Sequence, residues 1–219
     1  SVINNGIDLD SIQALPPAEE VLASLKLGPR ESIKIFGTLS RVSPEKGLDT
    51  LLEGFVEAAK RAPYIRLLVI GDCPGEHEKY IKMITQYIHE NGLDDTVKIL
   101  GAREDALEIL KSIDFYISPS RSEGLPYNLL EALAVGKPVM ATDIPGNNDI
   151  IRKSVEGILV PVNSARTLAH GILTLLELGP EERKAMRQNG KVRIRDEFSL
   201  NLMSEKTFSI YKKVLEGVS

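Results

Sequence analysis

The chain has 219 residues, of which 42% are apolar and 26% charged, with a formal charge of −4; this is the composition of a globular protein with one large or two small domains, not of a disordered or collagen-like chain. The acidic balance argues against nucleic acid as the main partner, the single cysteine argues against a disulfide scaffold, and no apolar run reaches the roughly 18 residues of a membrane span. The chain starts at Ser1 without a methionine or a secretory leader, which we interpret as either processing or excision from a longer protein.

Short apolar segments alternate with amphipathic segments along the chain. The apolar segments predict strands buried on both faces at 33–36, 67–70, 97–100, 115–118, 139–142 and 158–160. Helices are expected between them at 46–61, 76–90, 104–112, 126–135 and 165–177, and Asn91-Gly92 is expected to end the second as a left-handed C-cap. This alternation predicts a Rossmann-like, doubly wound α/β fold with a mostly parallel six-stranded sheet and helices on both faces.

After Val162 the pattern becomes helical to the end of the chain, with Gly179-Pro180 and Asn189-Gly190 as expected breaks. The last helix, 200–218, aligns an apolar stripe of Leu200, Met203, Thr207, Phe208, Tyr211, Val214, Leu215 and Val218. Such a stripe needs a cover, and packing on the chain's own sheet is favoured over packing on another domain. Six basic and two acidic residues lie between Glu181 and Arg195; a solvated helix face is favoured over contact with anionic lipid.

Two loops that follow predicted strands carry candidate binding residues. The first, residues 37–47, places Arg41 and Lys46 just before a helix, where two cations suit a diphosphate. An exposed loop with solvated cations is an equal alternative for this loop alone.

The second loop, within residues 118–132, passes from strand to helix over a few residues. Pro126 is expected in the first helical turn, which leaves the N–H groups of Leu125, Tyr127 and Asn128 free for a ligand. Glu123 and Glu131 are eight residues apart and are expected to approach one side of a ligand, where carboxylates accept hydrogen bonds from sugar hydroxyls. Taken alone, the pair is better explained as ordinary helix surface.

The combination of these loops with Gly136-Lys137-Pro138-Val139 resembles the donor-binding half of the GT-B glycosyltransferases, and most of all the large retaining family 4 (glycosyl transferases group 1). Residues 35–162 carry the resemblance in ordered motifs: SRVSPEKG, LLVIGD, VKILG, SPSRSEGLPYNLLEALAVGKPVMATD and EGILVPV. The segment 2–8 resembles the one that leaves the first domain of such proteins, and the last helix resembles the one that crosses back. The resemblance therefore implies an interdomain linker at 1–10, a nucleotide-sugar-binding domain at 11–196, and a crossing helix at 197–219.

The resemblance also implies roles for individual residues. Arg41 and Lys46 are expected to neutralise the diphosphate and to act with Glu123 in catalysis, where Glu123 holds the hydroxyls of the transferred sugar. Glu131 is expected to bind the ribose, Gly124, Leu125, Tyr127 and Asn128 to lie beside the donor, and the turn at Ala102 and Arg103 to meet the base. Transfer with retention of configuration, without a metal or other cofactor, is implied, as is a UDP- or GDP-sugar donor.

The remaining expectations concern partners. The acceptor, a glycan, lipid or small molecule, is expected on an N-terminal domain that this chain lacks, so that the isolated chain is nearly inactive. A cytoplasmic protein is expected, with peripheral contact at the cytoplasmic membrane surface as an additional expectation.

Two departures from the family pattern bear on the donor pose. Ser40 precedes the arginine and Pro126 opens the helix, where many members have glycine. Pro126 removes one N–H from the donor site.

Other polar motifs have simpler explanations. Asp8 and Asp10 form a D-x-D of the kind that holds a metal in another glycosyltransferase fold, but they stand before any strand. His77, His89 and His170 have no metal-ligand spacing, and Cys73 is interpreted as a small filler. No G-x-G-x-x-G follows the first strand, which argues against a dehydrogenase.

Two alternatives to the transferase stay open. A nucleotide-sugar epimerase shares the architecture and grips the same diphosphate, and a non-catalytic module that senses nucleotide sugars is the third hypothesis. The base, the sugar, the acceptor and the oligomeric state are not predicted.

Overall fold

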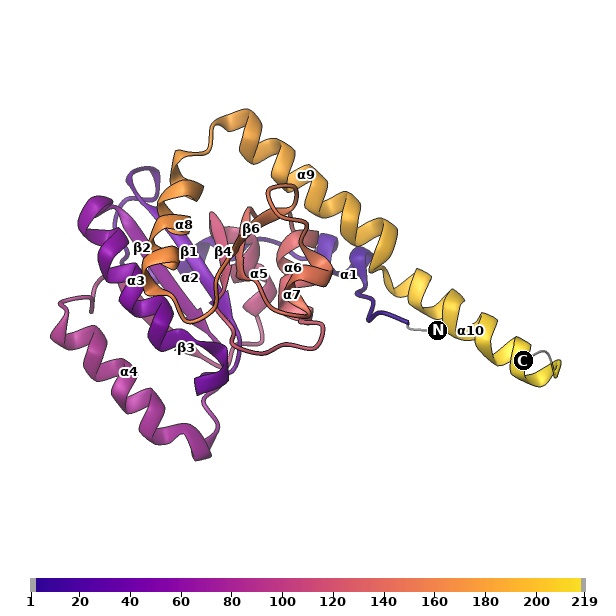
Figure 1. Cartoon of the computed structure of the whole chain (residues 1–219). Coiled ribbons are helices and arrows are strands. Elements are labelled where there is room, and N and C mark those ends of the chain that lie inside the picture. Colours follow the sequence, from indigo (N-terminus) through magenta and orange to yellow (C-terminus); the bar gives the residue numbers. More distant parts are fainter. Residues whose placement is uncertain (1–2, 218–219) are drawn as a thin grey trace.

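The computed structural model describes residues 3–217 as a single parallel sheet covered by helices (Figure 1). The six strands run in the order β3-β2-β1-β4-β5-β6, and each neighbouring pair is parallel. Their bounds are β1 Lys34–Leu39, β2 Ile65–Ile70, β3 Val97–Gly101, β4 Phe115–Ser118, β5 Val139–Thr142 and β6 Gly157–Val160. The expected doubly wound α/β fold is confirmed.

Helices cover both faces of the sheet (Figure 1). One core lies under α3 (Leu48–Arg61), α4 (Glu78–Glu90) and α8 (Ala165–Glu177). The other lies under α1 (Leu9–Ala14), α2 (Glu19–Ser24), α5 (Ala106–Ser112), α6 (Tyr127–Ala134), α7 (Asn147–Ile150) and α9 (Pro180–Glu197), of which α9 also contributes Met186 to the first core. Three 3₁₀ turns, η1 (Arg30–Ser32), η2 (Pro44–Lys46) and η3 (Gly75–His77), and a last helix, α10 (Leu200–Leu215), complete the described chain.

Alternate residues of the central strands belong to opposite cores. In β4, Tyr116 packs into one core while Phe115 packs into the other, where its ring stacks on Phe36 of β1 at 4.8 Å between centroids. Because successive side chains of a strand point to opposite faces, a continuous apolar run marks a strand covered on both sides. The edge strands differ from the expectation, since most residues of β3 and the middle of β6 are only half-buried.

Of the two breaks expected in the C-terminal helices, one is absent and one is present. Asn189-Gly190 does not interrupt α9, which continues to Glu197. A Cβ added at Gly190 would lie 2.8 Å from Leu133 Cδ2, so this glycine allows close packing of α9 on α6 and does not form a turn. Gly179-Pro180 does separate α8 from α9, with the proline in the first helical turn.

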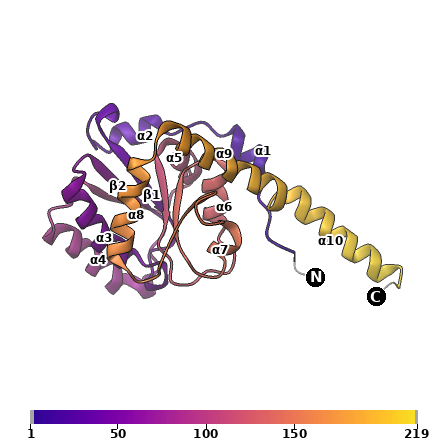
Figure 2. The ribbon, with the colours of Figure 1, turned by 45° about the horizontal axis from the view of Figure 1, so that its top comes forward.

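The expectation that the last helix packs on the chain's own sheet is wrong. No residue of α10 is buried, and its stripe leaves Phe208 72% and Leu215 87% exposed. Figure 2 shows α10 leaving the body as an extended helix, and Val218 of the predicted stripe lies outside the described residues, as do 1, 2 and 219. The amphipathic pattern predicts the helix, but it carries no information on where a covering surface lies.

The start of the described chain is fixed to the junction of α9 and α10. Ile7 donates its N–H to the Phe198 carbonyl and accepts from the N–H of Leu200, each at 2.9 Å. A Cβ at Gly6 would lie 2.5 Å from the Ser199 carbonyl oxygen. The two segments that the resemblance assigns to a domain connection are therefore neighbours. Across residues 3–217, no helix combines the length and hydropathy needed to cross a bilayer.

Candidate functional site

The candidate site lies where the chain path reverses across the sheet, at the carboxyl ends of β1 and β4. These strands are neighbours, with Phe36 opposite Phe115 and Gly37 opposite Tyr116. From β1 the sheet continues to β2 on one side and to β4 on the other. The loops after β1 and β4 start side by side, and the helices that follow them, α3 and α6, cover opposite faces of the sheet. Ligands of open parallel sheets bind in the crevice that such a switch point creates.

The loop after β1 is pressed against the loop after β4. Gly47, at the end of η2, has a φ of 66°, and a Cβ there would overlap the carbonyl oxygen of Pro119. The N–H of Arg121 donates to the Glu45 carbonyl at 2.7 Å. Only glycine meets both conditions at position 47, the left-handed backbone and the close approach.

Lys46 and Glu123 meet between these loops. The Lys46 Nζ lies 2.7 Å from Glu123 Oε1, and the side chains are only 16% and 9% exposed. The Ser120 hydroxyl donates to the same oxygen at 2.6 Å. The structure thus brings together a cation and a carboxylate that are 77 positions apart in sequence. Glu123 Oε1 is occupied by both donors, and neither of them contacts Oε2.

Glu131 lies one turn inside α6 and is half-buried. Burial raises the pKa of its carboxyl from 4.5 to about 7. Burial, followed by the negative fields of Glu123 and Glu131, raises the pKa of Tyr116. Both carboxyl groups therefore lie close enough to Tyr116 for their fields to act on its hydroxyl.

Asn128 connects the start of α6 to the end of β1. Its side-chain N–H donates to the Leu39 carbonyl, towards which the Tyr116 hydroxyl also points at 3.5 Å. Its side-chain oxygen accepts from the N–H of Leu129 at 2.9 Å. The Asn128 side chain is therefore held by the protein, and only its backbone N–H is available for the contact expected from the sequence.

The turn before α6 is exposed at its tip. Gly124 is exposed, Leu125 is half-buried, and the Tyr127 side chain is 50% exposed. Pro126 occupies the N-cap position and α6 begins at Tyr127, one residue later than expected. The backbone N–H groups of Tyr127 and Asn128 thus lie in the first turn, where a helix has no acceptor of its own. A Cβ at Gly146 would overlap the Gly124 carbonyl, which shows how closely the start of α7 supports this turn.

Arg41 and the turn after β3 border this centre without touching it. The Arg41 side chain is exposed. The pKa of Glu45 is lowered mainly by a hydrogen bond from its own backbone, and the positive field of Arg41 makes a smaller contribution in the same direction. Ala102 and Arg103 follow edge strand β3, two strands away from β1, and are exposed. The Arg103 guanidinium is bound to Asp105 at 2.7 and 2.6 Å, so its side chain is already engaged.

Arg121 is a structural residue of the site that the sequence did not single out. Its guanidinium donates to Asp49 and Thr50 at 2.9 Å each and to Asn163 at 2.7 Å, and it also contacts the Pro44 carbonyl. Burial alone would raise the Asp49 pKa, but hydrogen bonds led by the one from Arg121 lower it. Its position within SPSRSEG was the only signal, because its partners come from distant segments.

Three buried polar atoms near this edge have no hydrogen-bond partner within residues 3–217. They are Ser43 Oγ in the loop after β1, Ser118 Oγ at the end of β4 and Asn147 Oδ1 at the start of α7. The Asn147 amide N–H groups donate to Thr142, so its oxygen faces away from that contact. Unsatisfied buried polar atoms are rare in native structures, so each of these calls for a partner or a role.

The other candidate motifs have local roles. Asp8 caps α1 by accepting from the N–H and hydroxyl of Ser11 at 3.1 and 2.7 Å. His89 and His170 are exposed, and His77 and Cys73 are half-buried. In the part of the chain that the structure describes, no three His, Cys, Asp or Glu side chains are grouped to hold a metal ion.

Comparison with known proteins shows the family of this chain. The model of the family described as "Glycosyl transferases group 1" matches residues 24–193. The lipopolysaccharide core biosynthesis mannosyltransferase LpsB of Rhizobium meliloti is 24% identical over 98% of this chain and 61% of its own length. A D-inositol 3-phosphate glycosyltransferase of Mycobacterium sp. is 32% identical over 82% of this chain and 40% of its own length. The chain thus spans less than two thirds of either relative.

Solved structures share the fold over nearly the whole chain. A glycosyltransferase from Rickettsia africae is 26% identical with a TM-score of 0.90, covering 98% of this chain and 57% of that one. HepE from Anabaena, solved in complex with UDP and glucose, is 24% identical with a TM-score of 0.88, covering 97% and 56%. The chain belongs to the glycosyl transferases group 1 family, within the GT-B superfamily.

Proposed function

We propose that this chain binds the nucleotide-diphosphate sugar of a retaining glycosyltransferase at the edge formed by the β1 and β4 loops. The observation that carries the proposal is the pairing of Lys46 with Glu123 at the switch point of the sheet. A neutral sugar and an anionic diphosphate need a carboxylate and cations side by side, and this edge supplies both. The UDP and glucose bound to HepE support this ligand class.

Arg41 and Lys46 bind the diphosphate. Arg41 is exposed and makes no ion pair within residues 3–217, so its guanidinium is available to fork onto phosphate oxygens. Lys46 is a point charge on a flexible stem and exchanges Glu123 for the diphosphate when the donor binds. As the bond to the sugar breaks, negative charge grows on the leaving diphosphate and both cations stabilise it.

The two carboxyl groups bind hydroxyls. Glu123 Oε2 accepts from hydroxyls of the transferred sugar, while Ser120 keeps hold of Oε1. Glu131 accepts from the ribose, and hydroxyl donors favour its ionised form. The base lies against the backbone of Ala102 and Arg103, because the Arg103 side chain is held by Asp105. Backbone N–H groups of Gly124, Leu125, Tyr127 and Asn128 complete the donor contacts.

The reaction proposed is a front-face displacement without a metal. The bond between the anomeric carbon and the diphosphate oxygen breaks, and its electron pair goes to that oxygen. The acceptor hydroxyl oxygen bonds to the same face of the sugar, and its proton passes to the leaving diphosphate. The acceptor, a glycan, lipid or small molecule, is held by the part of the relatives' length that this chain does not span. Cytoplasmic location remains part of this proposal.

The proposal is tested by calorimetric titration of UDP and GDP. Losing one charged hydrogen bond costs about 1.5–3 kcal/mol, so Arg41→Ala and Lys46→Ala are each expected to weaken binding about tenfold or more. Lys79→Ala is the matched control, because this lysine of α4 is exposed and its side chain makes no hydrogen bond within residues 3–217. Equal affinity in all three variants would overturn the phosphate assignment. Products formed from a sugar donor by the full-length protein separate transfer from epimerisation, and absence of any product favours the sensing module.

A further inference from the structure

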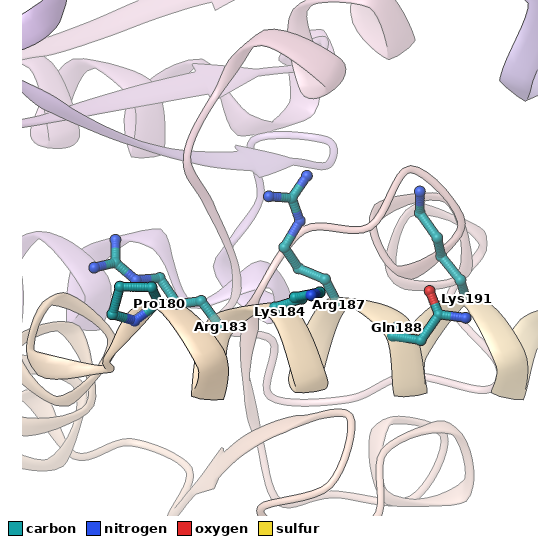
Figure 3. Close-up of a pocket in the computed structure, with 6 residues that line it drawn as sticks. All are labelled: Pro180, Arg183, Lys184, Arg187, Gln188 and Lys191. Carbon is teal, nitrogen blue, oxygen red and sulfur yellow. The ribbon is translucent and has the colours of Figure 1, made fainter.

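A groove of about 440 Å³ runs along the first half of α9, at a distance from the donor edge. It is lined by Pro180, Arg183, Lys184, Arg187, Gln188 and Lys191. Figure 3 shows that the side chains of Arg183, Arg187 and Lys191 project from the same side of the helix, as expected for positions four residues apart. We refer to these six residues as the α9 groove. No carboxylate lines it.

A second cavity of about 290 Å³ adjoins the α9 groove and shares Arg183 and Arg187 with it. It lies below the start of β5, and its charged lining includes Lys111, Lys137, Arg30, Glu19 and Asp114. Of the two acids, Asp114 is already bound to Arg30 at 2.9 Å and to the Ile35 N–H at 2.8 Å. The two cavities together therefore join seven cations and only two carboxylates in a chain whose formal charge is −4.

The cations of the α9 groove have no acidic partners within residues 3–217, unlike others on the same helix. Arg195 pairs with Asp196 at 2.7 Å, and Arg193 pairs with Glu197. By contrast, Arg187 donates only to the Gly136 carbonyl, at 2.8 Å, and the Lys191 stem crosses over the same glycine. Like charges held together without counter-charges repel one another, so the arrangement favours binding of an anion.

Lys137 provides an independent observation. Its side chain is buried, with the residue 8% exposed, and its ammonium donates to the carbonyls of Lys111 and Ile113 at 2.6 and 2.7 Å. An ammonium has three N–H donors, so two carbonyls leave one unmatched. Burial, reinforced by the field of Arg187, lowers the Lys137 pKa to about 8. Within the described chain the Lys137 ammonium contacts carbonyl oxygens and no carboxylate, and only the fields of Asp114 and Glu19 oppose the effect of burial, so this buried cation is only partly compensated.

We propose that the α9 groove and the adjoining second cavity, which Lys137 lines, form one binding site for a phosphate ester, either a monoester or a diester. The guanidinium groups of Arg183 and Arg187 fit phosphate oxygens in a forked geometry, and Lys184 and Lys191 add point charges at the rim. Residues 136–138 precede β5, so the site lies at the edge of the sheet opposite the donor loops. It is therefore a separate site, and it does not depend on the proposed donor function.

The test uses the whole chain, labelled with ¹⁵N, and two probes that represent the two sources of a phosphate group. Inorganic pyrophosphate represents a soluble ligand, and vesicles of equal parts phosphatidylcholine and phosphatidylglycerol represent a lipid headgroup, with pure phosphatidylcholine as their reference. Lys184→Gln with Lys191→Gln removes two exposed groove cations. Lys60→Gln with Lys79→Gln, on α3 and α4, removes the same charge from exposed positions without hydrogen bonds.

Pyrophosphate is expected to shift the amide signals of Gly136 and Lys191 saturably, with about tenfold weaker binding in the groove variant and unchanged binding in the control. Binding to the anionic vesicles alone, lost in the groove variant and kept in the control, supports the site and assigns it to a lipid headgroup. Neither response, or equal responses in the two variants, would overturn the proposal. Shifts at Gly47 and Gly124 report the donor edge separately, so the two proposals fail independently.

Discussion

The raised pKa of Glu131 implies that the stability of the chain depends on pH. Its value of about 7 lies roughly 2.5 units above the ordinary 4.5, and one unit corresponds to about 1.4 kcal/mol. Ionised Glu131 thus lowers the free energy of unfolding by up to about 3 kcal/mol. Between pH 4.5 and 7 the folded state binds more protons at this group than the unfolded state, so stability falls as the pH rises through that window and stays low above it.

Glu131→Gln removes this cost while keeping the shape of the protonated side chain. At pH 8 the variant is expected to be more stable by up to about 3 kcal/mol, a rise in Tm of up to roughly 6–12 °C for a chain of this length. At pH 4 the two proteins are expected to unfold alike. Urea and thermal unfolding across this pH range measure the difference. Glu53→Gln, an exposed carboxylate on α3, is the control and is expected to show no such dependence.

The same group links stability to ligand binding. If ribose hydroxyls donate to Glu131, they stabilise its ionised form and lower its pKa, and nucleotide binding near pH 7 releases a fraction of a proton. Calorimetry in two buffers of different ionisation enthalpy detects that proton, and Glu131→Gln abolishes the signal. A wild-type stability that matches that of Glu131→Gln at pH 8 would refute the burial argument, and nucleotide binding without proton release would refute the ribose role.

Three further results are expected. Arg121→Ala removes the hydrogen bonds to Asp49, Thr50 and Asn163. The free energy of unfolding of this variant is expected to fall by about 1.5–3 kcal/mol, and its nucleotide affinity is expected to fall as well. A reduced Tm with unchanged affinity in calorimetry would contradict a positioning role for Arg121. Gly47→Ala is expected to weaken nucleotide binding and to destabilise the chain more than Gly92→Ala, because both positions have positive φ but only position 47 faces a backbone oxygen; equal losses in urea unfolding would contradict the contact with Pro119. The chain alone is expected to transfer almost no sugar in a radiolabel assay, because an acceptor held close supplies much of the rate; turnover equal to that of the full-length protein would contradict this.

The parts of the fold that were predicted correctly depend on local pattern. Strands β4 and β5 and helix α8 have the bounds expected from the sequence, because a doubly covered strand and an amphipathic helix each leave a periodic signature. Gly92 has the expected left-handed conformation after α4, with a φ of 65°. Half-buried edge strands were not predicted, since strand order is not a local property.

Long-range relationships explain the remaining differences. Gly190 was expected to end a helix, but its role depends on Leu133, which lies on another element. The stripe on α10 was identified, but its exposure depends on what lies beyond the helix. At the site, the family resemblance implied that Lys46 and Glu123 act together, whereas the Arg121 contacts join segments with no pattern that connects them.

The most direct test of the account is a crystal structure of the chain with a nucleoside diphosphate sugar. We expect the diphosphate between the β1 and β4 loops, in contact with Arg41 and Lys46, with the Lys46–Glu123 ion pair opened and Glu123 turned to the sugar. A donor bound elsewhere on the molecule, or one that leaves this ion pair intact, would contradict the central claim.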